Sequence, residues 1–168
     1  VSVYPRSQTA LGTITAVTNV GPAIGVLATG DDQLLAQFSI AGRNSSSLNQ
    51  SKVTSVEFQV SKSPGVTVTN WYLKTLNGVQ RVNCTVSGTV MSCSDLPEEI
   101  GLLTTTGREM RLYGTVEVTA GTQNPFLQIG INRSGDISEA GAIRWTDGAG
   151  QFTWVPLQSP LANGTMLR

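Results

Sequence analysis

Apolar and polar residues alternate with a period of two along most of the chain, the pattern of strands that bury one face. No long stretch shows the period of a helix. Turn-forming pairs such as Gly21-Pro22, Asn77-Gly78 and Asp147-Gly148 separate the strands. The fold class predicted is all-β, an Ig-like or jelly-roll-type β-sandwich of mostly antiparallel strands. The alternating apolar sets are Leu34, Ala36, Phe38 and Ile40; Thr54, Val56, Phe58 and Val60; Met110, Leu112, Gly114, Val116 and Val118; and Leu127, Ile129 and Ile131.

The 168 residues are enough for one domain with a sizeable core. The alternation becomes clear only from Leu11, so we expect a single β-sandwich over residues 11–168 and an arm or linker over residues 1–10. The polar stretch 42–51 is expected to be an exposed loop. Residues 95–107 are expected to hold one helical turn or a long crossover.

Two hairpins follow one another between residues 66 and 95. The Asn77-Gly78 turn places Leu73 opposite Val82, and a turn at Gly88-Thr89 follows it. Together they predict a three-stranded meander with one apolar face. That face consists of Trp71, Leu73, Val82, Cys84, Val86, Met91 and Cys93.

The second hairpin places Cys84 opposite Cys93 at a non-hydrogen-bonded pair, where the Cα atoms lie roughly 4.5 Å apart. That separation allows a disulfide across the hairpin. Because disulfides persist in oxidising compartments, we expect an extracellular or cell-surface protein.

Charge is sparse and balanced: charged residues make up 13% of the chain, and 11 basic side chains match 11 acidic ones. A nucleic-acid binder needs a basic surface, so this composition argues against nucleic acid as a partner. No apolar run is long enough for a membrane span.

Histidine is absent, which removes the commonest general base and metal ligand. With both cysteines in a disulfide, no thiol nucleophile remains, and we expect a protein that is not an enzyme and has no cofactor. A hydrolase on a sandwich scaffold is a third, weaker alternative, because glycoside hydrolysis needs paired carboxylates and the acids show no such pairing. Asp136 and Glu139 could bind Ca²⁺ through their carboxylate oxygens. They are weak candidates, because acids in loops or before glycine usually stabilise turns.

Residues 142–155 predict another hairpin, with Ile143, Trp145, Phe152 and Trp154 on one face. Large aromatic side chains on such a face usually belong to the core. If exposed, Trp145 and Trp154 would instead form a platform on which a sugar ring could stack.

Sequons for N-glycosylation occur at Asn44, Asn49, Asn132 and Asn163, and a fifth at Asn83 lies beside Cys84. Richness in Ser and Thr is an alternative explanation of their number. If used, each sequon implies an exposed side chain.

The run from Val66 to Leu73, VTVTNWYL, resembles a strand of Ig-like domains in predicted surface proteins of Patescibacteria. The segments 141–148, 152–155 and Pro160 are similar to the closing part of that pattern, and 35–38 with 53–60 to its early strands. The resemblance implies an exported β-sandwich of surface proteins and carries no catalytic residue. The cysteine hairpin and the amino-terminal arm depart from it.

These features favour a non-enzymatic extracellular structural protein, a subunit of a pilus-like filament or a surface layer. Its partners would be copies of itself or neighbouring domains of a surface protein. Assembly by donor-strand addition would use the amino-terminal segment. The residues assigned to this assembly arm are Val1, Val3, Tyr4, Leu11 and Ile14. The alternative is an adhesin or carbohydrate-binding module, with a glycan as partner.

Overall fold

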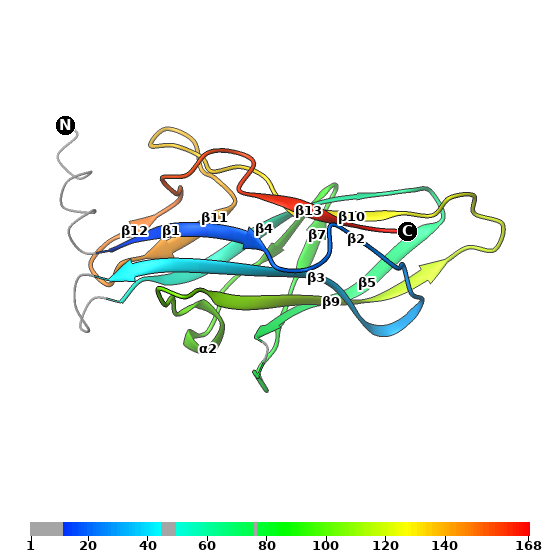
Figure 1. The fold of residues 1–168 in the computed structure, drawn as a ribbon, viewed down its shortest axis with the longest axis horizontal. Helices are drawn as coiled ribbons and strands as arrows, with labels where there is room; N and C mark the ends of the chain where they lie inside the picture. Colours follow the sequence, from blue (N-terminus) through cyan, green and yellow to red (C-terminus); the bar gives the residue numbers. More distant parts are fainter. Residues whose placement is uncertain (1–11, 45–49, 76) are drawn as a thin grey trace.

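The computed structural model describes residues 12–44, 50–75 and 77–168 (Figure 1). These residues form strands and one short helix. In chain order they are β1 (Gly12–Asn19), β2 (Ile24–Gly25), β3 (Gly30–Asn44), β4 (Lys52–Lys62), β5 (Val66–Thr75), β6 (Val82–Asn83), β7 (Thr85–Ser87), β8 (Val90–Cys93), α2 (Glu98–Gly101), β9 (Arg108–Val118), β10 (Leu127–Ile131), β11 (Ile143–Thr146), β12 (Gln151–Phe152) and β13 (Ala162–Leu167).

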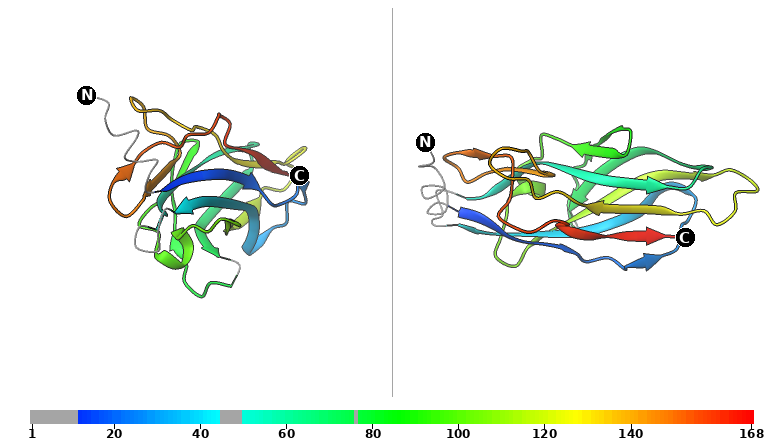
Figure 2. Two further views of the ribbon diagram at one scale, coloured as in Figure 1. Left: turned by 60° about the vertical axis from the view of Figure 1, so that its left-hand side comes forward. Right: turned by 90° about the horizontal axis from the view of Figure 1, so that it is seen from above.

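The strands form two sheets that lie face to face (Figure 2). Among the described residues, one sheet has the order β1-β3-β9-β5-β6. The second sheet has the order β12-β11-β4-β10-β13-β2, and the β7–β8 hairpin joins it by pairing β8 with β4. All pairs are antiparallel except β13 with β2, which is parallel. The predicted β-sandwich of mostly antiparallel strands is therefore confirmed.

The core lies between the sheets and contains the inward residues of both. Phe38 of β3 and Phe58 of β4 meet across the layers, with ring centroids 5.5 Å apart. On β9 the inward face follows the predicted alternation, from Met110 to Val116. Each strand that alternates over its full length therefore buries one of its two faces, which explains its sequence pattern.

Two alternations are wrong at their start. On β4, Val53 is buried and Thr54 is only half-buried, where the register with β11 shifts between Arg144 and Trp145.

The other case is on β3. Leu34 is 39% exposed, while its neighbour Leu35 is buried together with Ala36 and Phe38. The register with β9 shifts between Leu34 and Ala36, so a bulge turns two successive side chains inward.

The predicted meander over 66–95 is also wrong, although both of its hairpin registers are confirmed. Leu73 pairs with Val82, and Val86 pairs with Met91. However, β6 belongs to the first sheet and β7 to the second, so the chain crosses between the layers at Cys84. As a consequence Val86 lies outside the core and is 47% exposed.

The connecting segments are partly as expected. Residues 95–107 contain the helical turn α2, whose Gly101 lies against the backbone carbonyl of Val53, where a side chain would clash. Of the expected loop 42–51, residues 42–44 belong instead to β3, and Ser51 is buried. Residues 1–11 and 45–49 lie outside the described residues.

Candidate functional site

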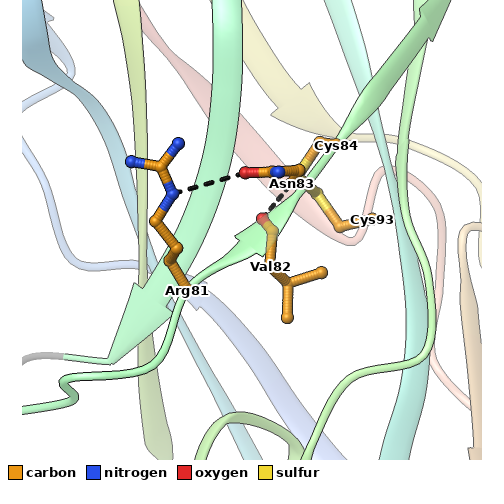
Figure 3. Close-up of a disulfide and its surroundings, with 5 residues drawn as sticks. All are labelled: Arg81, Val82, Asn83, Cys84 and Cys93. Atoms are coloured by element: carbon orange, nitrogen blue, oxygen red, sulfur yellow. Dashed lines mark hydrogen bonds between the residues drawn. A yellow bond between two sulfur atoms is a disulfide. The ribbon is translucent and has the colours of Figure 1, made fainter.

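The disulfide between Cys84 and Cys93 is present, with a Cα–Cα distance of 4.4 Å (Figure 3). The backbone N–H of Cys84 donates to the carbonyl of Trp71 on β5, at 2.8 Å. Cys93 is fully buried on β8, which pairs with β4 in the other sheet. The bond therefore holds the crossover between the two sheets and does more than close a hairpin.

At one margin of the sandwich β1, the outer strand of its sheet, lies beside β13 of the other sheet. Among the described residues, side chains and not backbone hydrogen bonds join these strands. The side-chain Nδ2 of Asn19 donates to the carbonyl of Asn163 and to the hydroxyl of Thr165, both at 3.1 Å. The two sheets therefore meet at this margin without a continuous ladder.

A groove of about 700 Å³ follows this margin, and we call it the seam groove. Small residues contribute much of its wall, including Gly21, Ala23, Ala162 and Gly164. None of its lining residues carries a charge. The full lining is Val17, Thr18, Asn19, Gly21, Ala23, Gln158, Ser159, Pro160, Leu161, Ala162, Asn163 and Gly164.

Of the predicted assembly arm, only Ile14 falls within the described residues. Ile14 is 1% exposed on β1, which pairs with β3 of the same chain. Its assignment to a donated arm is therefore wrong for the single chain, because Ile14 already fills its own core. Val1, Val3, Tyr4 and Leu11 lie outside the described residues.

The outer face of the first sheet carries an aromatic cluster that the alternation along the chain does not reveal. Tyr72 of β5 and Tyr113 of β9 are paired in register, and their rings stack at 5.1 Å. Lys74 Nζ lies 4.8 Å from the Tyr113 centroid, and Arg81 Cζ lies 4.2 Å from that of Tyr72. In the sequence, Tyr72 and Tyr113 both fall at outward positions of their strands. This indicates a shared cluster only once β5 and β9 are known to pair.

The hydroxyl of Tyr72 donates to Asp32 Oδ1 at 2.8 Å. Burial of the phenol, followed by this hydrogen bond to the carboxylate, raises the pKa of Tyr72 to about 12. The side chains of this cluster therefore already have partners within the chain, and they lie on a mainly polar face.

The predicted hairpin over 142–155 is confirmed, with Trp145 opposite Phe152. Trp145 is 4% exposed, stacks on Phe152 at 4.3 Å and donates its Nε1–H to the carbonyl of Trp154 at 2.8 Å. A sugar-stacking ring must be exposed, so Trp145 offers no platform. Trp154 is half-buried, and its role in ligand binding stays a prediction.

The acids proposed for calcium serve the loop that carries them. Asp136 Oδ1 accepts hydrogen bonds from the backbone N–H groups of Ser138 and Glu139 and from the Ser138 hydroxyl. The hydrogen bonds from Ser138, followed by the one from Glu139, lower the pKa of Asp136 below its usual value. Glu139 pairs with Arg133 at 3.5 Å. Over the described ranges, no three acids, cysteines or histidines lie close enough to hold a metal ion.

Three of the sequon asparagines, Asn83, Asn132 and Asn163, are exposed. Asn49 lies outside the described residues, and Asn44 ends β3. Glycosylation at the four sites stays a prediction. In residues 12–44, 50–75 and 77–168, no helix has the length and apolar character needed to cross a bilayer.

No family model matches the chain, and no curated protein matches it. The resemblance to Patescibacteria surface domains therefore rests on the quoted residues alone. Among solved structures, a type I cohesin in a cohesin–dockerin complex from Clostridium thermocellum has a TM-score of 0.43 at 12% identity, covering 94% of this chain and 98% of that one. A non-cellulosomal cohesin from Archaeoglobus fulgidus has a TM-score of 0.38 at 18% identity, covering 95% and 91%.

The major pilin subunit BcpA of Bacillus cereus has a TM-score of 0.38 at 10% identity, covering 93% of this chain and 40% of that one. At these identities and TM-scores the likeness transfers no ligand, partner or activity to this chain.

Proposed function

We propose that this chain is a non-enzymatic extracellular structural protein that assembles with copies of itself by strand addition. The amino-terminal residues 1–11 act as the donated strand, and a sheet edge of the next copy accepts it. The observation that carries the proposal is the position of β1 at the edge of its sheet, where its outer side pairs with no strand among the described residues.

The chemistry of the chain supports this role. The Cys84–Cys93 disulfide favours an oxidising location outside the cytosol. Equal numbers of acidic and basic residues leave no net charge, so copies approach each other without long-range repulsion. The acids considered for calcium, Asp136 and Glu139, are used by hydrogen bonds and an ion pair within their own loop.

Sedimentation velocity of the intact chain and of a chain lacking residues 1–11 tests the proposal. The intact chain should form species much larger than a monomer, and their share should grow with concentration. The shortened chain should sediment as a folded monomer, because β1 begins at Gly12 and keeps its pairing with β3. Equal assembly by both chains, or a strictly monomeric intact chain, would contradict it.

A further inference from the structure

We infer that the outer face of the second sheet binds a neutral oligosaccharide, in a groove over β4, β10 and β13 that we call the amide groove. Two hollows of about 250 and 650 Å³ form this groove, and they adjoin because Ser61 and Gln128 line both. The three strands are neighbours in the sheet (Figure 2). This binding activity goes beyond self-assembly and does not depend on it.

Pairing between the strands places the lining residues of the amide groove in two rows. In the first row Gln128 of β10 is paired with Ser61 of β4 on one side and with Met166 of β13 on the other. In the second row Gly130 is paired with Gln59, two residues or roughly 6.8 Å farther along the strands. Both rows face outward, because the residues of β10 that alternate with Gln128 and Gly130 are buried.

The second row is hollow because two glycines meet there. A Cβ on Gly130 would lie 3.3 Å from the Cα of Gly164, and a Cβ on Gly164 would clash with the carbonyl oxygen of Ile129. Backbone therefore forms the floor of the groove at this point. Gln59 and Asn132 line the same hollow beside this floor.

The polar side chains of the amide groove are not used by the fold. Gln59, Ser61 and Gln128 are exposed, and their side chains make no hydrogen bond to another described residue. Asn19, at the margin of the sandwich, instead uses its amide to bind Asn163 and Thr165. An amide side chain is both a donor and an acceptor, as a sugar hydroxyl is, so the two can pair in either direction.

Apolar side chains line the other end of the amide groove. Phe126 is half-buried and lines the larger hollow together with Pro125 and Met166. A half-exposed ring offers an apolar surface to the C–H face of a sugar. Ligand sites generally combine such apolar surface with a few polar groups that fix the orientation of the ligand.

The lining favours a neutral oligosaccharide over other extracellular ligands. β10 is paired with β4 and with β13, so it offers no free edge to an added peptide strand. Arg168 is the single charged residue in the lining, which is too little to hold a polyanion. Recognition therefore falls to uncharged amide and hydroxyl groups, and a sugar chain presents hydroxyls along its whole length.

An array of defined neutral and acidic oligosaccharides, probed with the intact chain, tests the inference, and titration calorimetry with the best neutral one measures Kd. Gln59→Ala and Gln128→Ala should each raise Kd about fivefold, because each loses a hydrogen bond to the ligand. Gln151→Ala is the matched control and should leave Kd unchanged, since Gln151 is an exposed amide on β12 of the same sheet, outside the groove. All three side chains are exposed, so the variants should keep the fold, which circular dichroism checks.

Three results would overturn the inference. The first is a lack of binding to every neutral oligosaccharide on the array, whether or not acidic ones bind. The second is a Kd that Gln59→Ala and Gln128→Ala change no more than Gln151→Ala does. The third is a glycan attached to Asn132 or Asn163 in the native protein, found by mass spectrometry, because both residues line the smaller hollow and the glycan would fill it. None of these results bears on assembly, which sedimentation velocity tests separately.

Discussion

Tyr72 and Tyr113 stack on each other on the outer face of the first sheet. Two cations lie over the rings, and one hydroxyl is bound by Asp32. The pKa of Tyr72 is raised from the ordinary 10.0 to about 12, mainly by burial. The folded chain therefore holds this proton more tightly than the unfolded chain does.

Because the pKa of Tyr72 differs between the folded and the unfolded chain, the free energy of unfolding depends on pH. The contribution of Tyr72 is fully present below pH 10.0 and is lost as the pH rises toward about 12. Tyr72→Phe should lower stability by about 1 kcal/mol at neutral pH, because the bond to Asp32 is lost, and should flatten the decline above pH 10.0. Chemical unfolding at a series of pH values checks this, and an unchanged alkaline slope in Tyr72→Phe would contradict it.

Two buried tryptophans differ in one respect that can be measured. Trp145 donates its indole N–H to Trp154, while Trp71 Nε1 is buried with no hydrogen-bond partner among the described residues. Trp145→Phe leaves a carbonyl unpaired, whereas Trp71→Phe removes an unpaired donor. The first should therefore cost about 1–2 kcal/mol more than the second. Urea unfolding followed by circular dichroism measures the loss of stability in both variants. Equal losses would contradict the claim that only the Trp145 indole has a hydrogen-bond partner among the described residues.

Among the strands, the turn-forming residues predicted correctly which neighbouring strands pair. Asn77-Gly78 and Gly88-Thr89 fixed the registers of two hairpins and placed the cysteines opposite each other. The sequence could not show that these hairpins belong to different sheets, because inward residues alternate in the same way on either layer. It also could not show the bulge beside Leu34, since a run of Leu34, Leu35 and Ala36 fits two registers.

The disulfide should stabilise the crossover between the sheets. It closes a loop of about ten residues, and the chain-entropy relation gives roughly 2–3 kcal/mol for such a loop. Reduction should lower Tm by roughly 5–10 °C in a chain of this length. A chain with Cys84→Ala and Cys93→Ala should show the lower Tm and no response to reductant. A Tm unaffected by reduction of the intact chain would contradict this role.

The margin at β1 and β13 depends on which strands lie at the sheet edges. Asn19 and Asn163 meet there although 144 positions separate them. No local pattern predicts such a meeting, so this margin could not be predicted from the sequence. Ile14 shows the same limit: its alternation fits a strand, and only the pairing of β1 with β3 shows that it stays in its own chain.

Negative-stain electron microscopy of the intact chain, beside the chain lacking residues 1–11, shows whether assembly depends on the amino-terminal arm. The intact chain should form regular filaments, with an axial repeat close to the long dimension of one subunit. The shortened chain should give only dispersed monomers. Dispersed monomers in both samples, or the same filaments in both, would contradict assembly through the amino-terminal arm.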